Sequence, residues 1–170
     1  MANQNRRGFI KGAGVALGAV SAVGAGFAGV AMKRAWDPLP SVVAGGVTVV
    51  DTAGMKGGDI KQVEYRGKPV QILKKMADWE VNDARDVVVN GEKYTVIIAI
   101  CTHLGCIPSW KPTKKLFHCA CHGGTYDVNA VNNFGPPPTP MVIPPFSIEG
   151  TVLSLGNIGP EYQALLAKQV

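Results

Sequence analysis

Two short boxes of cysteine and histidine constrain this chain more than any other feature. The first box reads CTHLGC at residues 101–106, and the second reads CACHGGTYD at residues 119–127. All four cysteines of the chain lie in these two boxes. A Cys-x-His pair in one turn and a Cys-x-x-His pair in another can each present a thiolate and an imidazole to one metal centre. The chain is therefore predicted to fold around a centre held between two loops.

Two thiolates and two imidazoles form the candidate ligand set: Cys101, His103, Cys119 and His122. These side chains suit a tetrahedral zinc ion in a structural knuckle. Zinc gives no reason for the two further cysteines, Cys106 and Cys121. The third histidine, His118, precedes a candidate ligand on a predicted strand, where adjacent side chains face opposite sides. We therefore assign His118 to the surface or to packing.

The two boxes resemble those of Rieske iron-sulfur proteins, in which cysteines hold one iron of a [2Fe-2S] cluster and histidines hold the other. The resemblance implies one ligand pair for each iron: Cys101 and Cys119 on the inner iron, His103 and His122 on the outer iron. It also implies a disulfide between Cys106 and Cys121 that ties the two loops together.

Three features are similar to the Rieske subunits of quinol-oxidising cytochrome bc-type complexes. These are the cysteine pair outside the ligand set, RGKPV at residues 66–70, and GPPP at residues 135–138. The resemblance implies a membrane quinol:cytochrome c oxidoreductase, with cytochrome b and cytochrome c1-type partners in a dimeric complex and quinol as substrate. The small Rieske subunit of an arsenite-oxidase-like enzyme is an alternative, and a zinc-stapled periplasmic binding module is another.

The resemblance also implies roles for residues around the cluster. His122, with His103, would carry the proton chemistry, and His122 would contact quinol. Leu104 would be an apolar contact beside the cluster. Shielding would fall to three prolines: Pro136, Pro137 and Pro138.

Two further positions concern the reduction potential. High-potential relatives usually have Ser at the place of Gly124, where its hydroxyl donates to a bridging sulfide. Tyr126, whose hydroxyl bonds a ligand sulfur in the family, is retained. Because donors to sulfur stabilise the reduced cluster, we predict a potential below that of relatives with both donors, suited to menaquinol.

The first 41 residues indicate export and anchoring. Residues 1–11 contain NRRGFIK, which resembles a twin-arginine signal and is predicted to remain in the cytoplasm. Residues 12–32 carry no charge and could span a core of about 30 Å as a helix, either as a retained anchor, which we favour, or as a cleaved signal. Residues 33–41 would form a neck. The head, residues 42–170, would then lie in the periplasm of a bacterium, beside the inner membrane that the single helix crosses, where a disulfide persists.

The net charge of +5 does not indicate a nucleic-acid partner. The first forty residues carry +4, while the remainder has twelve basic and eleven acidic residues. The basicity therefore flanks the apolar segment and forms no phosphate-binding face.

The head is predicted to be mainly β, a Rieske-type antiparallel β-sandwich with a small cluster-binding subdomain. Short β-rich runs separated by turns support this class, and Asn90-Gly91 favours a type I′ hairpin. The runs are 47–50, 60–65, 69–73, 87–89, 93–100, 116–118, 125–128, 141–149 and 151–155. Residues 74–86 are predicted to form a short amphipathic helix, and residues 160–168 a terminal one.

Overall fold

In the computed structural model of the protein, residues 2–37, 42 and 45–168 are described. The chain divides into two units, Met1–Val43 and Ala44–Val170.

The first unit contains one long helix, α1 (Ala2–Trp36), rich in alanine and glycine. Its side chains from Asn5 onward are exposed, and by length and composition it could cross a membrane. The helix extends beyond the predicted span 12–32 at both ends, because the flanking Lys and Arg residues are also good helix formers. The first four residues of the predicted neck 33–41 continue the helix, and residues 38–41 lie outside the described part of the chain.

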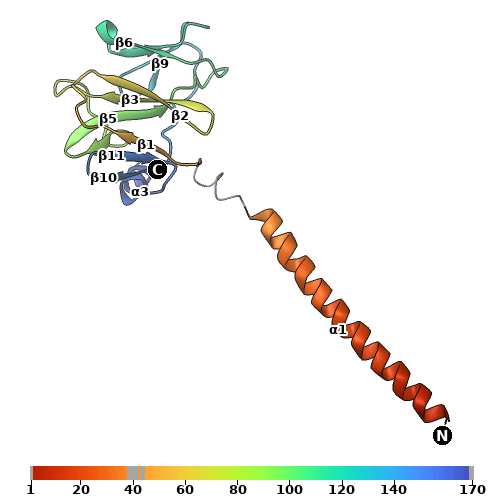
Figure 1. The fold of residues 1–170 in the computed structure, drawn as a ribbon. Helices are drawn as coiled ribbons and strands as arrows, with labels where there is room; N and C mark the ends of the chain where they lie inside the picture. The colour runs from red at the N-terminus through yellow and green to blue at the C-terminus, as the bar shows by residue number, and fades with distance from the viewer. Residues whose placement is uncertain (1, 38–41, 43–44, 169–170) are drawn as a thin grey trace. The chain divides into compact units, whose positions relative to one another are not determined.

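Three antiparallel sheets make up the second unit, in the orders β1-β11-β10, β2-β3-β5-β4 and β6-β7-β8-β9. Figure 1 shows β2, β3 and β5 between β6 and β9 on one side and β10, β11 and α3 on the other. A short 3-10 turn, Pro112–Lys114, follows β6, and the terminal helix is α3 (Pro160–Ala167). The strands are β1 (Thr48–Asp51), β2 (Ile60–Tyr65), β3 (Lys68–Lys74), β4 (Val87–Val89), β5 (Glu92–Ile98), β6 (Ser109–Lys111), β7 (Leu116–His118), β8 (Thr125–Tyr126), β9 (Asn132–Phe134), β10 (Phe146–Glu149) and β11 (Val152–Leu155).

The middle sheet has a core on both faces, which explains why β3 and β5 are buried along most of their length. Side chains alternate along a strand, so Val70 and Ile72 face one core while Leu73 faces the other. The first core packs against β10, β11 and α3, and it contains Phe146, Leu153, Leu155 and Leu165. The second core contains Phe117 and Tyr126 of the β6-β7-β8-β9 sheet together with Cys101 and Cys119 of the two boxes.

The predicted class is confirmed: a mainly β head of antiparallel sheets, in which the small β6-β7-β8-β9 sheet includes part of the second box. The hairpin at Asn90-Gly91 has positive φ at both residues, +49° and +80°, as a type I′ turn requires. The predicted strand 141–149 is shorter and begins at Phe146. Pro144 and Pro145 precede it and have no N–H to donate to a strand ladder.

The helix predicted over residues 74–86 is wrong. Lys74 is the last residue of β3, and the chain then proceeds through turns to β4. Asn82 and Asp86 stabilise these turns through side-chain bonds to backbone N–H groups: Ala84 N–H donates to Asn82 Oδ1 at 3.1 Å, and Asn82 N–H donates to Asp86 Oδ2 at 3.1 Å. Short polar side chains of this kind compete with helical hydrogen bonding.

Candidate metal centre

The two boxes form loops that close in the same way. In the first, the Cys101 N–H donates to the Cys106 carbonyl at 2.7 Å, and the Gly105 N–H donates back to the Cys101 carbonyl at 2.9 Å. In the second, the Cys119 N–H donates to the Gly124 carbonyl at 2.8 Å, and the Gly123 N–H donates to the Cys119 carbonyl at 3.1 Å. We call residues 101–106 and 119–124 the cluster loops.

Both loops need glycine at the fifth position. Gly105 has a φ of +83° and Gly123 a φ of +72°, a region that L side chains rarely enter. Each loop also follows a strand directly or nearly so, since β5 ends at Ile98 and β7 ends at His118. The sheets therefore fix where both loops begin.

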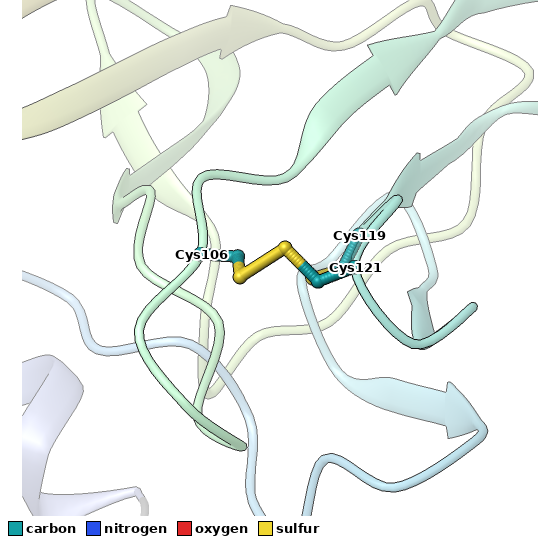
Figure 2. Close-up of side chains that lie close together, drawn as sticks. All are labelled: Cys106, Cys119 and Cys121. Atoms are coloured by element: carbon teal, nitrogen blue, oxygen red, sulfur yellow. A yellow bond between two sulfur atoms is a disulfide. The ribbon is translucent and has the colours of Figure 1, made fainter.

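A disulfide between Cys106 and Cys121 joins the two loops, with the Cα atoms 6.7 Å apart. Figure 2 shows this bond between the facing loops, with Cys119 beside Cys121. The predicted pairing is thus confirmed. The sulfurs of Cys106, Cys119 and Cys121 lie within 4.8 Å of one another, but two of them form the disulfide and offer no thiolate. These three residues are therefore not a ligand set.

Cys101 and Cys119 are free and buried, and they are the thiols that can bind metal. Their sulfurs are hydrogen-bonded to each other, so the structure brings them together. Cys101 Sγ also accepts hydrogen bonds from the backbone N–H groups of His103 and Leu104. Cys119 Sγ accepts two from the corresponding residues of the other loop, Cys121 and His122. Such donors stabilise negative charge on sulfur.

The two thiols differ in acidity because of Tyr126. Burial works to raise the pKa of Cys101, but the Tyr126 hydroxyl, backbone N–H groups and the Cys119 thiol donate to its sulfur and together lower that pKa. Burial and the bond to Cys101 raise the pKa of Cys119. Burial, followed by the bond to Cys101, likewise raises the pKa of Tyr126.

The two histidines lie next to each other. The rings of His103 and His122 have centroids 4.8 Å apart and planes at 85°. His103 is half-buried, whereas His122 is exposed. Two adjoining thiols with N–H donors and two adjoining imidazoles are the donor set that a [2Fe-2S] centre with mixed ligation requires. The residues present therefore fit such a cluster.

Comparison with known proteins agrees with this donor set. The family model of the Rieske [2Fe-2S] domain matches residues 46–146. The chain belongs to the Rieske [2Fe-2S] family. The ubiquinol-cytochrome c reductase iron-sulfur subunit of Allochromatium vinosum is 33% identical over 162 residues, which cover 76% of this chain and 78% of the relative. The subunit of the same name from Bradyrhizobium diazoefficiens is 32% identical over 160 residues, covering 84% and 90%.

A solved structure supports the same Rieske fold. A chain described as belonging to a hyperthermophilic respiratory Complex III is 34% identical, with a TM-score of 0.63, and the match covers 82% of this chain and 97% of that one.

The residues expected to flank a Rieske cluster differ in how deeply they are buried and in what they contact. Tyr126 donates to Cys101 Sγ at 3.4 Å and accepts from the Thr102 N–H at 2.9 Å. Leu104, in the first cluster loop, is 70% exposed. Of the three prolines only the middle one, Pro137, is buried, and it contacts Gly124, while Pro136 and Pro138 are exposed. His118 is half-buried on β7, consistent with a surface or packing residue.

Residues 74–86, for which the sequence predicts no chemistry, contain part of a buried polar group. Lys75 forms an ion pair with Asp86, and both side chains are 2% exposed. The Lys75 ammonium also donates to the Asn129 side chain and, at 2.9 Å, to the Glu80 carbonyl. A buried charge is tolerated only when it is paired and hydrogen-bonded in this way.

Arg85 connects this group to residues 130–141, which contain the three prolines and which we call the proline segment. Its Nε donates to the Asn129 carbonyl at 2.7 Å, and its second guanidinium nitrogen donates to the Met141 carbonyl at 2.5 Å. The Met141 N–H donates to the Ala130 carbonyl at 3.0 Å, so a hydrogen bond joins the two ends of residues 130–141. We call Lys75, Arg85, Asp86 and Asn129 the clamp. Nothing in the sequence distinguishes Lys75 from a solvated lysine, so only the fold reveals it.

Proposed function

We propose that this protein is the electron-carrying subunit of a membrane quinol:cytochrome c oxidoreductase. The observation that carries the proposal is the pair of Rieske loops joined by the Cys106–Cys121 disulfide, with the exposed His122 beside it. Both relatives reported above are named as such subunits, and each is matched over more than three quarters of its length. In this proposal the partners are cytochrome b and a cytochrome c1-type subunit, in a dimeric complex.

Four side chains would hold the cluster: Cys101 and Cys119 on one iron, His103 and His122 on the other. When bound, the cluster supplies a one-electron carrier whose potential is raised by its two neutral ligands. His122 is our quinol contact because it is the more exposed histidine. Its second ring nitrogen accepts a hydrogen bond from a quinol hydroxyl and takes that proton. His103, half-buried beside it, is a second place for a proton.

The charges balance in this scheme. A quinol releases two electrons and two protons when it becomes a quinone. One electron enters this subunit and continues to the c-type cytochrome, while the other passes to cytochrome b. One proton goes to His122, and the other is released to the surrounding water. Because reduction and protonation favour each other, the midpoint potential falls as pH rises.

The N-terminal part of the proposal concerns location. Residues 1–11 would act as a twin-arginine signal, residues 12–32 as the retained anchor in a bacterial inner membrane, 33–41 as the neck, and 42–170 as the periplasmic head. The 35-residue helix α1 is long enough for the anchor. Export in the folded state suits a protein whose metal is inserted before it crosses the membrane.

The expected potential is low for the family. Tyr126 supplies one hydroxyl to Cys101 Sγ, whereas Gly124 has no side chain to supply another. Fewer donors to sulfur leave the reduced state less stable. We therefore propose menaquinol as the substrate. The comparisons lend no support to an arsenite-oxidase-like subunit or to a zinc-stapled module.

Purification of the tagged full chain from its own membranes tests the proposal. We expect b-type and c-type haems to copurify, with quinol:cytochrome c reductase activity that His122→Ala abolishes. Copurification with a molybdenum subunit, in place of haems, would overturn it.

A further inference from the structure

The contact between Gly124 and Pro137 is too close for any side chain at position 124. A Cβ built on Gly124 would lie 2.6 Å from Pro137 Cγ and 2.7 Å from its Cδ. Nonbonded carbon atoms normally stay about 3.5–4.0 Å apart. Gly124 and Pro137 are both buried, so the ring of Pro137 fills the space that a side chain would take.

A second glycine makes this approach possible from the other side. A Cβ on Gly135 would lie 2.9 Å from Gly124 Cα, and Gly135 has a φ of +86°. The two backbones therefore meet without side chains between them. The proline segment lies directly against the second cluster loop only because both positions are glycine.

Pro137 has little freedom to move away. Its ring fixes φ, and because the ring is closed the side chain cannot swing away by free rotation about χ1. Its carbonyl accepts a hydrogen bond from Asn132 Nδ2 at 3.0 Å, and the Thr139 carbonyl, two residues on, accepts one from Thr102 Oγ1 at 2.7 Å. Arg85 donates a hydrogen bond to the Met141 carbonyl and so fixes the C-terminal end of the proline segment. A side chain at position 124 would therefore have to displace an anchored segment.

We propose that Pro137 is a positioning residue that keeps position 124 free of a side chain and so excludes a hydroxyl donor from this side of the cluster. Hydrogen bonds to cluster sulfurs are among the determinants of the reduction potential. The low reduction potential is then a property of the Gly124–Pro137 pair. Gly124→Ser alone cannot raise the potential without also displacing Pro137. This inference rests on the proposed cluster, but its steric part does not depend on quinol.

A double-mutant cycle on the full chain in detergent tests the pair. Gly124→Ala and Gly124→Ser each add a Cβ, and only the second adds a hydroxyl. We expect both to lower the melting temperature by about 5 °C, the size that overpacking predicts, and to reduce cluster occupancy. Adding Pro137→Ala should restore most of the loss in each case. Only Gly124→Ser with Pro137→Ala should then show a raised midpoint potential.

Two results would overturn the inference. One is a melting temperature for Gly124→Ala equal to that of the unchanged protein, because no steric exclusion would then exist. The other is equal potentials for the Ser and Ala double variants, because position 124 would then not reach the cluster. An unchanged protein that binds zinc and no cluster would refute the proposed function, while the melting temperatures would still test the steric pair.

Discussion

The cluster loops and the clamp stabilise the head by opposite means. The loops are partly exposed, carry the four side chains proposed as ligands and are joined by a covalent bond between Cys106 and Cys121. The clamp carries none of these side chains; Lys75, Asp86 and Asn129 are buried and Arg85 is half-buried. Its Lys75–Asp86 ion pair closes the turns before β4, and the Lys75–Asn129 hydrogen bond ties those turns to the chain after β8. Chemistry is therefore concentrated in two short motifs, whereas support comes from residues as many as 54 positions apart in sequence.

The clamp should show the largest effect on stability. Lys75→Met leaves Asp86 buried without its partner, which costs about 3–5 kcal/mol of the free energy of unfolding. Denaturant unfolding of the full chain in detergent, followed by near-ultraviolet circular dichroism, measures this. Lys75→Met with Asp86→Leu is the matched control and should recover part of the loss, because it removes both charges. Equal losses in the single and double variants would mean that the ion pair is not what Lys75 contributes.

The disulfide should come next. Cys106→Ala with Cys121→Ala releases a cross-link over a separation of 15 residues, worth about 3 kcal/mol in unfolding free energy. The same unfolding assay, with the unchanged protein under reducing conditions for comparison, tests it. A variant as stable as the parent would show that the sheets alone fix the two loops.

Tyr126, on β8 after the second cluster loop, bonds to the first cluster loop and should have a smaller effect. Tyr126→Phe removes the donor to Cys101 Sγ while keeping the buried ring. One hydrogen bond of about 1 kcal/mol that favours the reduced state corresponds to a fall of roughly 40 mV in midpoint potential. A redox titration measures this fall, and a potential unchanged by the substitution would rule out Tyr126 as a tuning residue.

The smallest effect is expected at an exposed ion pair between Asp78, which lies near Lys75 in sequence, and Lys115, which follows the 3-10 turn. Lys115 and Asp78 lie 3.2 Å apart, with more than half of each side chain exposed. Asp78→Asn should change the unfolding free energy by about 0.2–1 kcal/mol, since water and salt screen such pairs. A loss as large as that of Lys75→Met would show that burial does not separate the two pairs.

The same contrast explains what sequence could predict. The cluster loops follow from spacing, and the strands leading to Cys101 and Cys119 follow from short β-rich runs. The clamp does not, because the partners of Lys75 are 11 and 54 residues away and a lysine among charges is usually solvated. The sequence does not indicate β9, because Asn132 and Asn133 have low strand propensity. This segment forms a strand through its pairing with β8.

The most direct test of the account is a redox titration of the full chain, followed by low-temperature electron paramagnetic resonance at several pH values. We expect a rhombic signal of mixed Cys and His ligation in the reduced protein, with a midpoint potential that falls as pH rises. A silent spectrum together with stoichiometric zinc would contradict it.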